Sequence, residues 1–539
     1  MNNGPYTPPA PQSGAGIPPR FSGVNPPPAP KPRLFDRKAE DVAAAIITVI
    51  LSILGVSALL WDGLRLGYTL TYDALFILST AYMLRKGSRP APVPLILGLL
   101  SLICSWSFFI TSNVSVRLVA LAATAFGGVV WLASLSGSRS SGGDFGTLGL
   151  FFGSIIRALA DLPRALASLF SKRDGKSSAA GKILVGVLCA VPLLFVVVPL
   201  LLSSDLAFSS LMDRLVGDVG TIFQKIVLGL IVSVFLIAGL FSLRYGAERS
   251  RVPASGKGLS ALSVGAFLWA LDAVYLIYLF SQLAYFFSAF SGILPDGYTF
   301  SYAEYARRGF FELCAVAAIN LAVILAAIAA SEKKSGGIPW GVRLPALFTV
   351  AVTFVMIGTS AAKMIMYINV YGMTVMRVCT CAFMLWMATV FVAALLRLFV
   401  RRLDVTVTAA VSGLLILAVL GVGNVNSFIA RYNYDRYLSS AKVDVQYFAD
   451  LRDEGVPYLC KLADDPDPDV SSQARRALRE ALPAYFDGAA RHELVNIDLD
   501  TYKALKRTRI GLGTISRCGE TAYAALDQYA ADHDGFVTL

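Results

Sequence analysis

Long apolar segments constrain this chain most, because about 20 apolar residues can cross the hydrocarbon core of a bilayer as one helix. The 539 residues have a mean hydropathy of +0.63, with 56% hydrophobic and only 15% charged residues. This balance excludes an ordinary soluble protein and is typical of a polytopic membrane protein. We predict an all-α fold: a polytopic transmembrane helix bundle of about eleven spans with a small, mainly helical C-terminal soluble domain. The predicted spans are 42–60, 66–84, 93–111, 114–135, 183–202, 222–243, 262–286, 309–330, 344–362, 378–400 and 405–423.

Composition divides the chain into five parts. Residues 1–33 contain eleven prolines and almost no large apolar side chains, which predicts a disordered tail. The segment "DFGTLGLFFGSIIRALADLPRALASLF" mixes charged and apolar residues and predicts an amphipathic helix in the membrane interface. The predicted parts are a disordered cytoplasmic tail (1–40), the first four transmembrane helices (41–136), a cytoplasmic loop with the interfacial helix (137–182), a seven-helix transmembrane core (183–424) and an extracytoplasmic helical domain (425–539).

The distribution of Lys and Arg predicts the orientation in the membrane, because cytoplasmic loops collect basic residues. With the N-terminus inside, the inner segments hold 25 of the 47 Lys and Arg residues, the outer loops hold 10, and the region from residue 439 holds 12. We therefore predict a multi-pass protein of the cell (plasma) membrane with a cytoplasmic N-terminus. An odd number of spans then places the C-terminal domain outside the cytoplasm.

Polar side chains inside the predicted spans are costly in lipid and therefore informative. Asp272 and Gln282 lie in one narrow sector of a single span, which predicts that this stripe faces the bundle interior or a water-filled cavity. Asp272 is equally compatible with a functional role and with structural hydrogen bonding, whereas structural bonding is favoured for Gln282 and Asn320. The intramembrane polar residues are Asp73, Asp272, Gln282, Glu312 and Asn320.

Three stretches rich in Arg and Tyr are predicted to share the outer face. They are "SYAEYARRGFFEL", "AAKMIMYINVYGMTVMR" and "NVNSFIARYNYDRYL". Such clusters fit an aromatic belt with cationic anchors, and they equally fit a pocket for an anion or lipid headgroup. The candidate binding residues are Arg307, Arg308, Lys363, Arg377, Arg431 and Arg436.

The C-terminal region contains two helical patterns separated by "DDPDPD", with Asp469 or Ser471 as candidate N-cap of the second helix. Cys460 and Cys518 are the cysteines of this region. A disulfide between them is possible if the domain faces an oxidising exterior, and two free thiols is the alternative.

The three Arg- and Tyr-rich blocks, in this order, resemble a bacterial family of multi-pass membrane proteins that carries only a domain-of-unknown-function label, of the 4153/4173 type. The resemblance covers roughly residues 180–480. It implies a bacterial cell-membrane protein without an assigned activity, and it transfers no catalytic residue.

Three functions remain open on the sequence. A sensing, scaffolding or regulatory protein with an outer anion or headgroup site is favoured, and its partners would be the lipid bilayer, an anionic lipid or small anion, and a protein that binds the C-terminal domain. A proton- or cation-coupled secondary transporter using Asp73 and Asp272 is the alternative, and an enzyme acting on a lipid-linked substrate is the third. The two histidines, His492 and His533, lie far from the apolar segments, so we expect no metal, no cofactor and no nucleic-acid partner.

Overall fold

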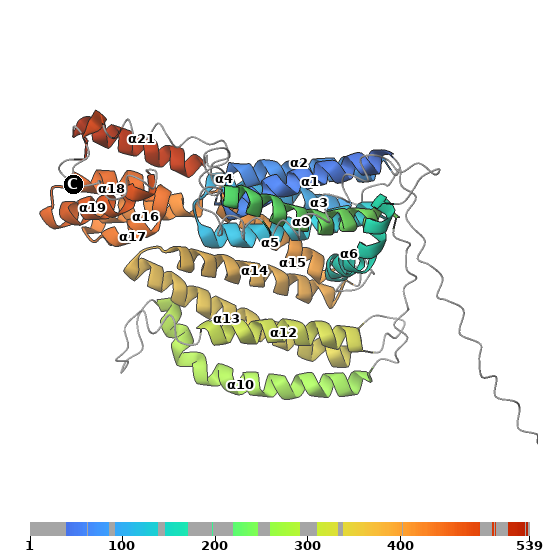
Figure 1. The fold of residues 1–539 in the computed structure, drawn as a ribbon. Coiled ribbons are helices and arrows are strands. Elements are labelled where there is room, and N and C mark those ends of the chain that lie inside the picture. Colours follow the sequence, from blue (N-terminus) through green and yellow to red (C-terminus); the bar gives the residue numbers. More distant parts are fainter. Residues whose placement is uncertain are drawn as a thin grey trace, which may run out of the picture.

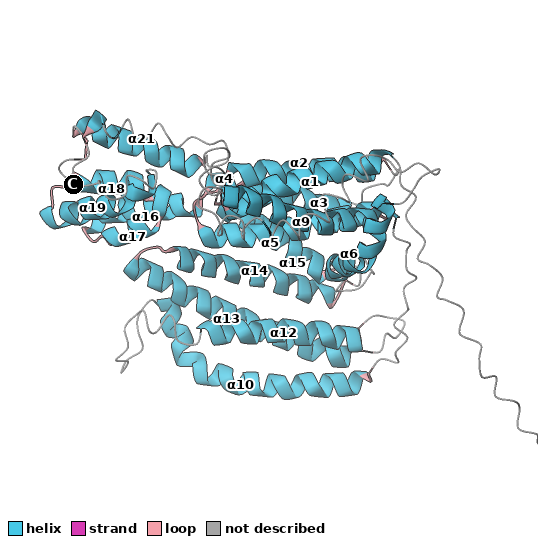
Figure 2. Cartoon of the chain, viewed as in Figure 1, coloured by secondary structure: helices cyan, strands magenta, loops and turns pink. Residues whose placement is uncertain are grey.

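The computed structural model describes residues 39–61, 63–85, 92–137, 146–170, 197, 219–245, 259–291, 310–331, 338–400, 403–485, 498–500, 502, 516–533 and 535–536. Figure 1 shows long helices packed side by side, with a group of shorter helices at one end. Within the described residues the regular structure is helical, without strands (Figure 2).

Nine helices in the described part of the chain are long and apolar enough to cross a membrane. They are α1 (Ala39–Leu60), α3 continued by α4 (Pro92–Ser105 and Ser107–Ile110), α5 (Val114–Leu135), α9 (Val219–Tyr245), α10 (Ala261–Ser291), α12 (Phe310–Ala330), α13 (Trp340–Tyr371), α14 (Val375–Arg397) and α15 (Val405–Val422). The predicted all-α polytopic fold is thus confirmed.

Two predicted spans fall outside this set. The predicted span 66–84 is helix α2 (Leu66–Leu84), which has 19 residues but is less apolar because Tyr, Thr and Asp73 interrupt it. The predicted span 183–202 lies, apart from residue 197, outside the described residues. Helix α13 extends beyond the predicted 344–362 at both ends.

The long helices form two groups (Figure 1). In the first helix group, α1 packs against α2 and α9, and α3 packs against α5 and α15. In the second helix group, α13 packs against α10, α12 and α14. The contact between α14 and α15 joins the two groups.

A charged cluster fixes the end of the first helix group at which α1 begins. Arg244 of α9 is 5% exposed and hydrogen-bonds to the carboxylate of Glu40 and the carbonyl oxygen of Tyr82. Asp41 is fully buried and accepts hydrogen bonds from the hydroxyls of Tyr82 and Tyr245, each at 2.7 Å. The cluster joins the start of α1 to the ends of α2 and α9.

Helix α6 (Gly146–Phe170) covers the same end of the bundle. Its Asp161 accepts a hydrogen bond from Ser242 of α9 at 2.8 Å, and Ala165 packs in one cluster with Ala45 of α1. The opposite, exposed side of α6 carries Phe152 and Ile156. The predicted interfacial location of this helix stays a prediction.

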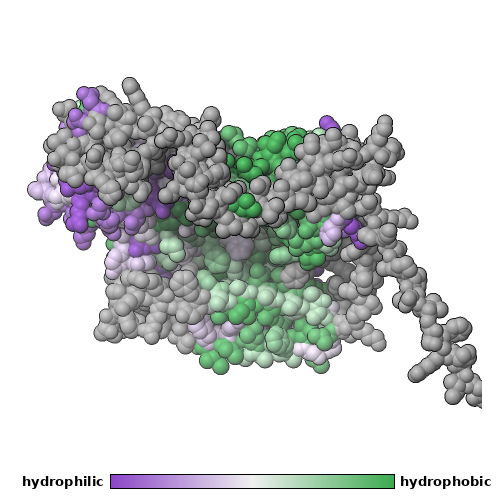
Figure 3. All heavy atoms as spheres, viewed as in Figure 1, coloured by the Kyte–Doolittle hydropathy of each residue, from purple (hydrophilic) through white to green (hydrophobic). Residues whose placement is uncertain are grey.

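The described surface divides by polarity. Apolar side chains are exposed along the bundle, and Figure 3 shows hydrophobic residues over the long helices and hydrophilic residues over the group of short helices. Ile277 of α10, for example, is 71% exposed. Exposed apolar residues of this extent are stable against lipid and costly in water.

The short helices form the C-terminal domain, which lies at the end of the bundle opposite the start of α1 (Figure 1). Its described elements are α16 (Val425–Ser440), α17 (Val445–Asp450), η1 (Arg452–Glu454), α18 (Val456–Ala463), α19 (Pro468–Ala481), η2 (Leu482–Tyr485) and α21 (Arg517–Asp532). The N-cap of α19 is Asp467, not Asp469 or Ser471. Because Pro468 has no N–H to satisfy and a fixed φ, it suits the first helical position, so the helix begins earlier than expected.

Close helix packing in the first group depends on Gly229 of α9. A Cβ atom at this position would lie 2.5 Å from the Cα of Ile53 in α1, whereas a Cβ at Gly239 of the same helix would meet Ala158 at an ordinary 3.8 Å. We expect Gly229→Ala to destabilise the protein by about 1–3 kcal/mol because the two backbones must separate. Gly239→Ala, the matched control, is expected to be neutral or slightly stabilising in thermal denaturation of the detergent-solubilised protein. Equal melting temperatures for the two variants would contradict this packing.

Candidate functional site

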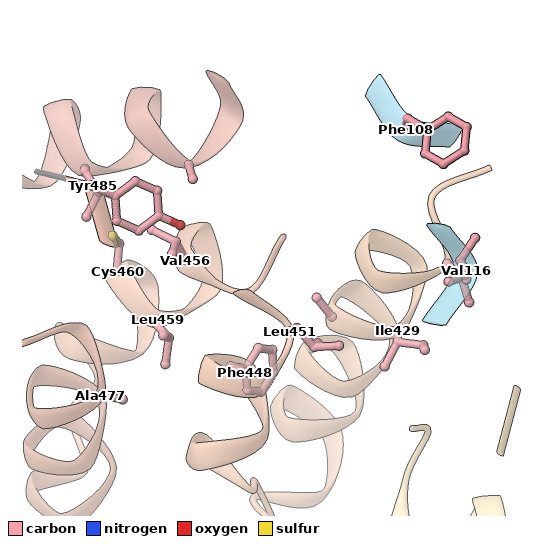
Figure 4. Packing of buried hydrophobic residues seen from close by; sticks show 14 of the residues in the cluster. Phe108, Val116, Ile429, Phe448, Leu451, Val456, Leu459, Cys460, Ala477 and Tyr485 are labelled. Carbon is pink, nitrogen blue, oxygen red and sulfur yellow. The ribbon is translucent and has the colours of Figure 1, made fainter. Parts of the chain in front are cut away.

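The bundle and the C-terminal domain share one hydrophobic core. Leu97 and Val116 of the bundle belong to the same buried cluster as Ile429 of α16, and Phe448 and Leu459 continue it into the domain. Figure 4 shows Phe108 and Val116 beside Ile429, with Leu451 and Phe448 leading on towards Leu459 and Cys460. The domain is therefore packed onto the bundle through apolar contacts, which favours a fixed arrangement.

A buried carboxylate anchors this junction. Glu454 of η1 is 5% exposed, and it accepts hydrogen bonds from the backbone N–H of Ser112 at 2.8 Å and from the hydroxyl of Thr111 at 3.1 Å. The hydroxyl of Ser112 donates to its second oxygen. Thr111 and Ser112 form the connection between α4 and α5, so we call this set of bonds the Glu454 clasp. Burial raises the pKa of Glu454 above its ordinary value, although the bonds from Ser112 oppose this.

Two asparagines extend the clasp. The Asn113 side chain caps α5 by accepting a hydrogen bond from the N–H of Val116 at 2.9 Å, while its amide donates to Asn426 of α16 at 2.8 Å. The amide of Asn426 in turn donates to the carbonyl oxygen of Leu451 at 3.4 Å. One buried network thus links α5, α16 and the turn before η1.

A cavity of about 310 Å³ lies at this junction, with walls from the bundle end and from the C-terminal domain. Three arginines line it: Arg65 before α2, Arg117 in the first turn of α5, and Arg452 in η1. Arg117 is 7% exposed, and it donates from Nε to the carbonyl of Thr111 at 2.7 Å and from Nη1 to that of Gly63 at 3.0 Å. Its Nη2 is buried and has no hydrogen-bond partner among the described residues.

The remaining polar residues of the cavity wall have partners. Asp453 accepts hydrogen bonds from the Tyr485 hydroxyl at 2.8 Å and from the Cys518 thiol at 3.5 Å. Glu480 pairs with Arg476 at 3.2 Å on the exposed side of α19. These acidic groups reduce the positive charge of the cavity without forming an ion pair to Arg117 or Arg452 among the described residues.

The Arg- and Tyr-rich stretches predicted to share a face are partly within the described residues. Two of them meet: Arg436 of α16 donates to the carbonyls of Asn369 and Val370 at 3.0 and 2.7 Å, and Arg377 hydrogen-bonds to the carbonyl of Gly372. These carbonyls end α13, where arginines satisfy unpaired acceptors and suit the helix dipole.

The other predicted binding residues lie elsewhere. Arg431 is exposed and lies 3.7 Å from Asp435 one helical turn away. Lys363 lies within α13 and is half-buried. Arg307 and Arg308 lie outside the described residues. None of the four described ones lines the cavity at the junction, and the anion site assigned to the six residues stays a prediction.

The described polar residues Asp272 and Tyr275 of α10 face the bundle interior. Asp272 is 1% exposed and accepts a hydrogen bond from Thr349 of α13 at 2.7 Å, while its Oδ2 has no partner among the described residues. Asn320 is fully buried, accepts a hydrogen bond from Tyr275 and donates to Thr353 at 2.9 Å. It therefore joins α10, α12 and α13.

The remaining intramembrane candidates are less well defined. The half-buried Asp73 accepts a hydrogen bond from Ser105 at 2.7 Å. The side chains of Gln282 and Glu312 lie outside the described residues.

The cysteines of the C-terminal domain do not form a disulfide: Cys460 and Cys518 are both free and buried, so the alternative of two free thiols describes this structure. Cys460 lies in the apolar core, and Cys518 donates to Asp453 at the first turn of α21. Burial raises the pKa of each thiol to about 12, which keeps both protonated and unreactive.

A family model described as a domain of unknown function (DUF4153) matches residues 97–462. The chain belongs to the DUF4153 family. The predicted resemblance is confirmed, but the match begins near residue 97 rather than 180, and so includes α3, α5 and the Glu454 clasp. Neither the curated proteins nor the solved structures contain a match.

In this DUF4153 protein the second and third Arg- and Tyr-rich stretches are hydrogen-bonded to each other. The side chain of Asn433 in α16 hydrogen-bonds both to the N–H of Met373 at 2.9 Å and to its carbonyl oxygen at 2.7 Å. Gly372 has a φ of 82°, and a Cβ there would approach Arg436 to 2.8 Å. The turn between α13 and α14 is thus held against α16.

Sequence reasoning missed the residues of the junction. In the sequence Arg65 and Arg117 contribute only to the charge balance of the outer segments, and Glu454 resembles a solvated acidic residue beside Asp453. A detectable signal was the position of Arg65 and Arg117 at the starts of two spans. A cation is unfavourable there because it meets the positive end of the helix dipole.

The clasp predicts a defined response to substitution and pH. Glu454→Ala leaves buried donors of Thr111 and Ser112 without an acceptor, so we expect a loss of about 2–3 kcal/mol of stability in thermal denaturation. Glu520→Ala, which removes an exposed carboxylate of the same domain, is the control with little expected effect.

The pH dependence has a definite sign. Burial raises the pKa of Glu454 in the folded protein. Its contribution to the free energy of unfolding is therefore greatest below the ordinary pKa of 4.5 and declines as the pH rises through the raised pKa. Glu454→Gln removes this titration and is expected to flatten the pH profile of the melting temperature in that interval. An unchanged profile would exclude Glu454 as the titrating group.

Proposed function

We propose that this protein is a sensing or regulatory membrane protein in which an extracytoplasmic C-terminal domain and the transmembrane bundle act as one coupled unit. The observation that carries this proposal is the Glu454 clasp together with the shared core, because a domain that merely hung from a linker would have no buried polar network to the bundle. Coupling requires contacts of this kind between the two parts.

The orientation part of the proposal has two supports. Basic residues favour a cytoplasmic start of α1, and the C-terminal domain lies at the other end of the first helix group. This second support does not depend on counting the spans. The hydrophilic surface of the domain would then be available to a protein partner or to the headgroups of the outer leaflet.

The side chains at the junction cavity favour binding over catalysis. The cavity at the junction presents arginines and tyrosines, and its Asp453 is occupied by hydrogen bonds. These groups bind and orient an anion more readily than they activate a nucleophile.

Coupling between the two parts is testable by hydrogen exchange. Leu459→Ala opens a cavity in the core of the C-terminal domain, at a cost of about 2–5 kcal/mol, and we expect faster exchange at the amides of residues 111–117 in the bundle. The matched control is Leu268→Ala, an equally buried leucine of the second helix group, which should leave those amides unchanged. Equal exchange at 111–117 in both variants would contradict the coupling.

A second candidate function, a proton- or cation-coupled transporter, is favoured by Asp272. A buried carboxylate with one unpartnered oxygen inside the second helix group is the kind of site that binds a proton or cation in transporters. Helix α13 contributes Thr349, whose hydroxyl donates to the other oxygen of this carboxylate at 2.7 Å.

The transporter alternative predicts a proton flux that requires the carboxylate. Protein reconstituted in liposomes with an entrapped pH-sensitive dye should carry protons, and Asp272→Asn should slow the flux by about tenfold or more. Asp404→Asn is the control, because Asn replaces Asp well at the N-cap of α15. No protein-dependent flux, or identical rates in both variants, would eliminate this candidate.

A further inference from the structure

Arg117 is a buried cation of the junction whose hydrogen-bonding capacity is only partly used. A guanidinium excluded from water is costly unless its donors and its charge are satisfied. Two of its nitrogens reach backbone carbonyls, which satisfy hydrogen bonds but supply no full negative charge. The two carboxylates that act on it have other hydrogen-bond partners. Glu454 is bonded to Thr111 and Ser112, and Asp453 to Tyr485 and Cys518. The buried Nη2 therefore has a donor and a charge left for something that the described residues do not provide.

Arg452 adds a second cation to the same cavity at a conformational cost. Its backbone has a φ of 57°, in the left-handed region that is strained for a residue other than glycine. The strained turn presents Arg452 at the cavity wall, opposite the bundle side from which Arg65 and Arg117 come. Within the described part of the chain, neither Arg117 nor Arg452 takes part in an ion pair.

The volume and the lining define the ligand chemistry. A cavity of about 310 Å³ lies at the lower end of the range of small-molecule sites, which begins at roughly 300 Å³. Guanidinium groups match the oxygens of phosphates by paired hydrogen bonds, and the hydroxyl-bearing rings of Tyr485 and Tyr523 supply a polar yet partly apolar wall.

We propose that the junction cavity binds a phosphate group through Arg117, Arg452 and Arg65. Free phosphate, a small phosphate ester and a phospholipid headgroup present the same group to these arginines. This inference rests on the docked arrangement in the proposed function, because the cavity exists only while bundle and domain are together. A bound phosphate would bridge the two parts and hold the domain in place.

The test uses the full-length protein in detergent and the variant Arg452→Gly. Glycine accepts the left-handed backbone without strain, so this variant removes the charge while the fold is kept. Arg431→Gln is the control, because Arg431 is an exposed arginine of the same domain that does not line the cavity. Stabilisation by inorganic phosphate is measured by thermal denaturation against chloride at equal ionic strength, and retained phospholipid is measured by native mass spectrometry.

We expect phosphate to raise the melting temperature of the wild-type protein, and the half-maximal concentration to increase about tenfold or more in Arg452→Gly but not in Arg431→Gln. If the natural source is a lipid, the wild-type protein and Arg431→Gln retain a phospholipid that Arg452→Gly loses. Either result supports the site and identifies the source.

Two results would overturn the proposal. One is a wild-type protein that is neither stabilised by phosphate nor carries phospholipid. The other is an identical loss in Arg431→Gln and Arg452→Gly, which would indicate non-specific screening. Protection of the C-terminal domain from trypsin, measured on the same samples, distinguishes failure of the phosphate site from failure of the proposed function. A protected domain without phosphate binding refutes the site alone. An unprotected domain refutes the docked arrangement.

Discussion

A carboxylate excluded from water needs hydrogen-bond donors in fixed positions, and at Glu454 this requirement determines how the two parts of the molecule fit together. Its donors come from Thr111 and Ser112, a connection that cannot move independently because Asn113 caps α5 and Arg117 binds the carbonyl of Thr111. The positions of η1, of this connection and of α5 are thus interdependent, and the arginine-lined cavity results from that arrangement.

A second set of hydrogen bonds attaches α16 to the second helix group. The C-terminal carbonyls of α13 receive donors from Arg436 and Arg377, and Asn433 fixes the turn that follows. Helix α16 therefore contacts the first helix group through Asn426 and the second through Asn433 and Arg436. Helix α16, which follows the last span, thus connects the two helix groups. These contacts explain the polar residues of the family-like block 424–437.

Sequence reasoning succeeded where one local property decides the outcome and failed where partners come from distant segments. Length and hydropathy alone determine a span, so the long helices were predictable, and the cost of an aspartate in lipid was enough to expect Asp272 on an inward face. The partners of Arg436 were not predictable because backbone carbonyls carry no sequence signature. Arg65, Arg117 and Arg452 belong to three segments far apart in the sequence, and only the docking of the domain brings them to one cavity.

The electrostatic potential at the junction favours an anion. Arg65 precedes α2 and Arg117 lies in the first turn of α5, so each cation stands at the positive end of a helix dipole. Cation and dipole reinforce each other, and low-dielectric walls concentrate the resulting field at the cavity between them. The carboxylates of Asp453 and Glu454 offset part of it, and protonation of Glu454 would remove one of these negative charges. Linkage then requires that protonation of Glu454 and binding of an anion at Arg117 favour each other, so acidification would favour both the docked arrangement and the proposed phosphate site.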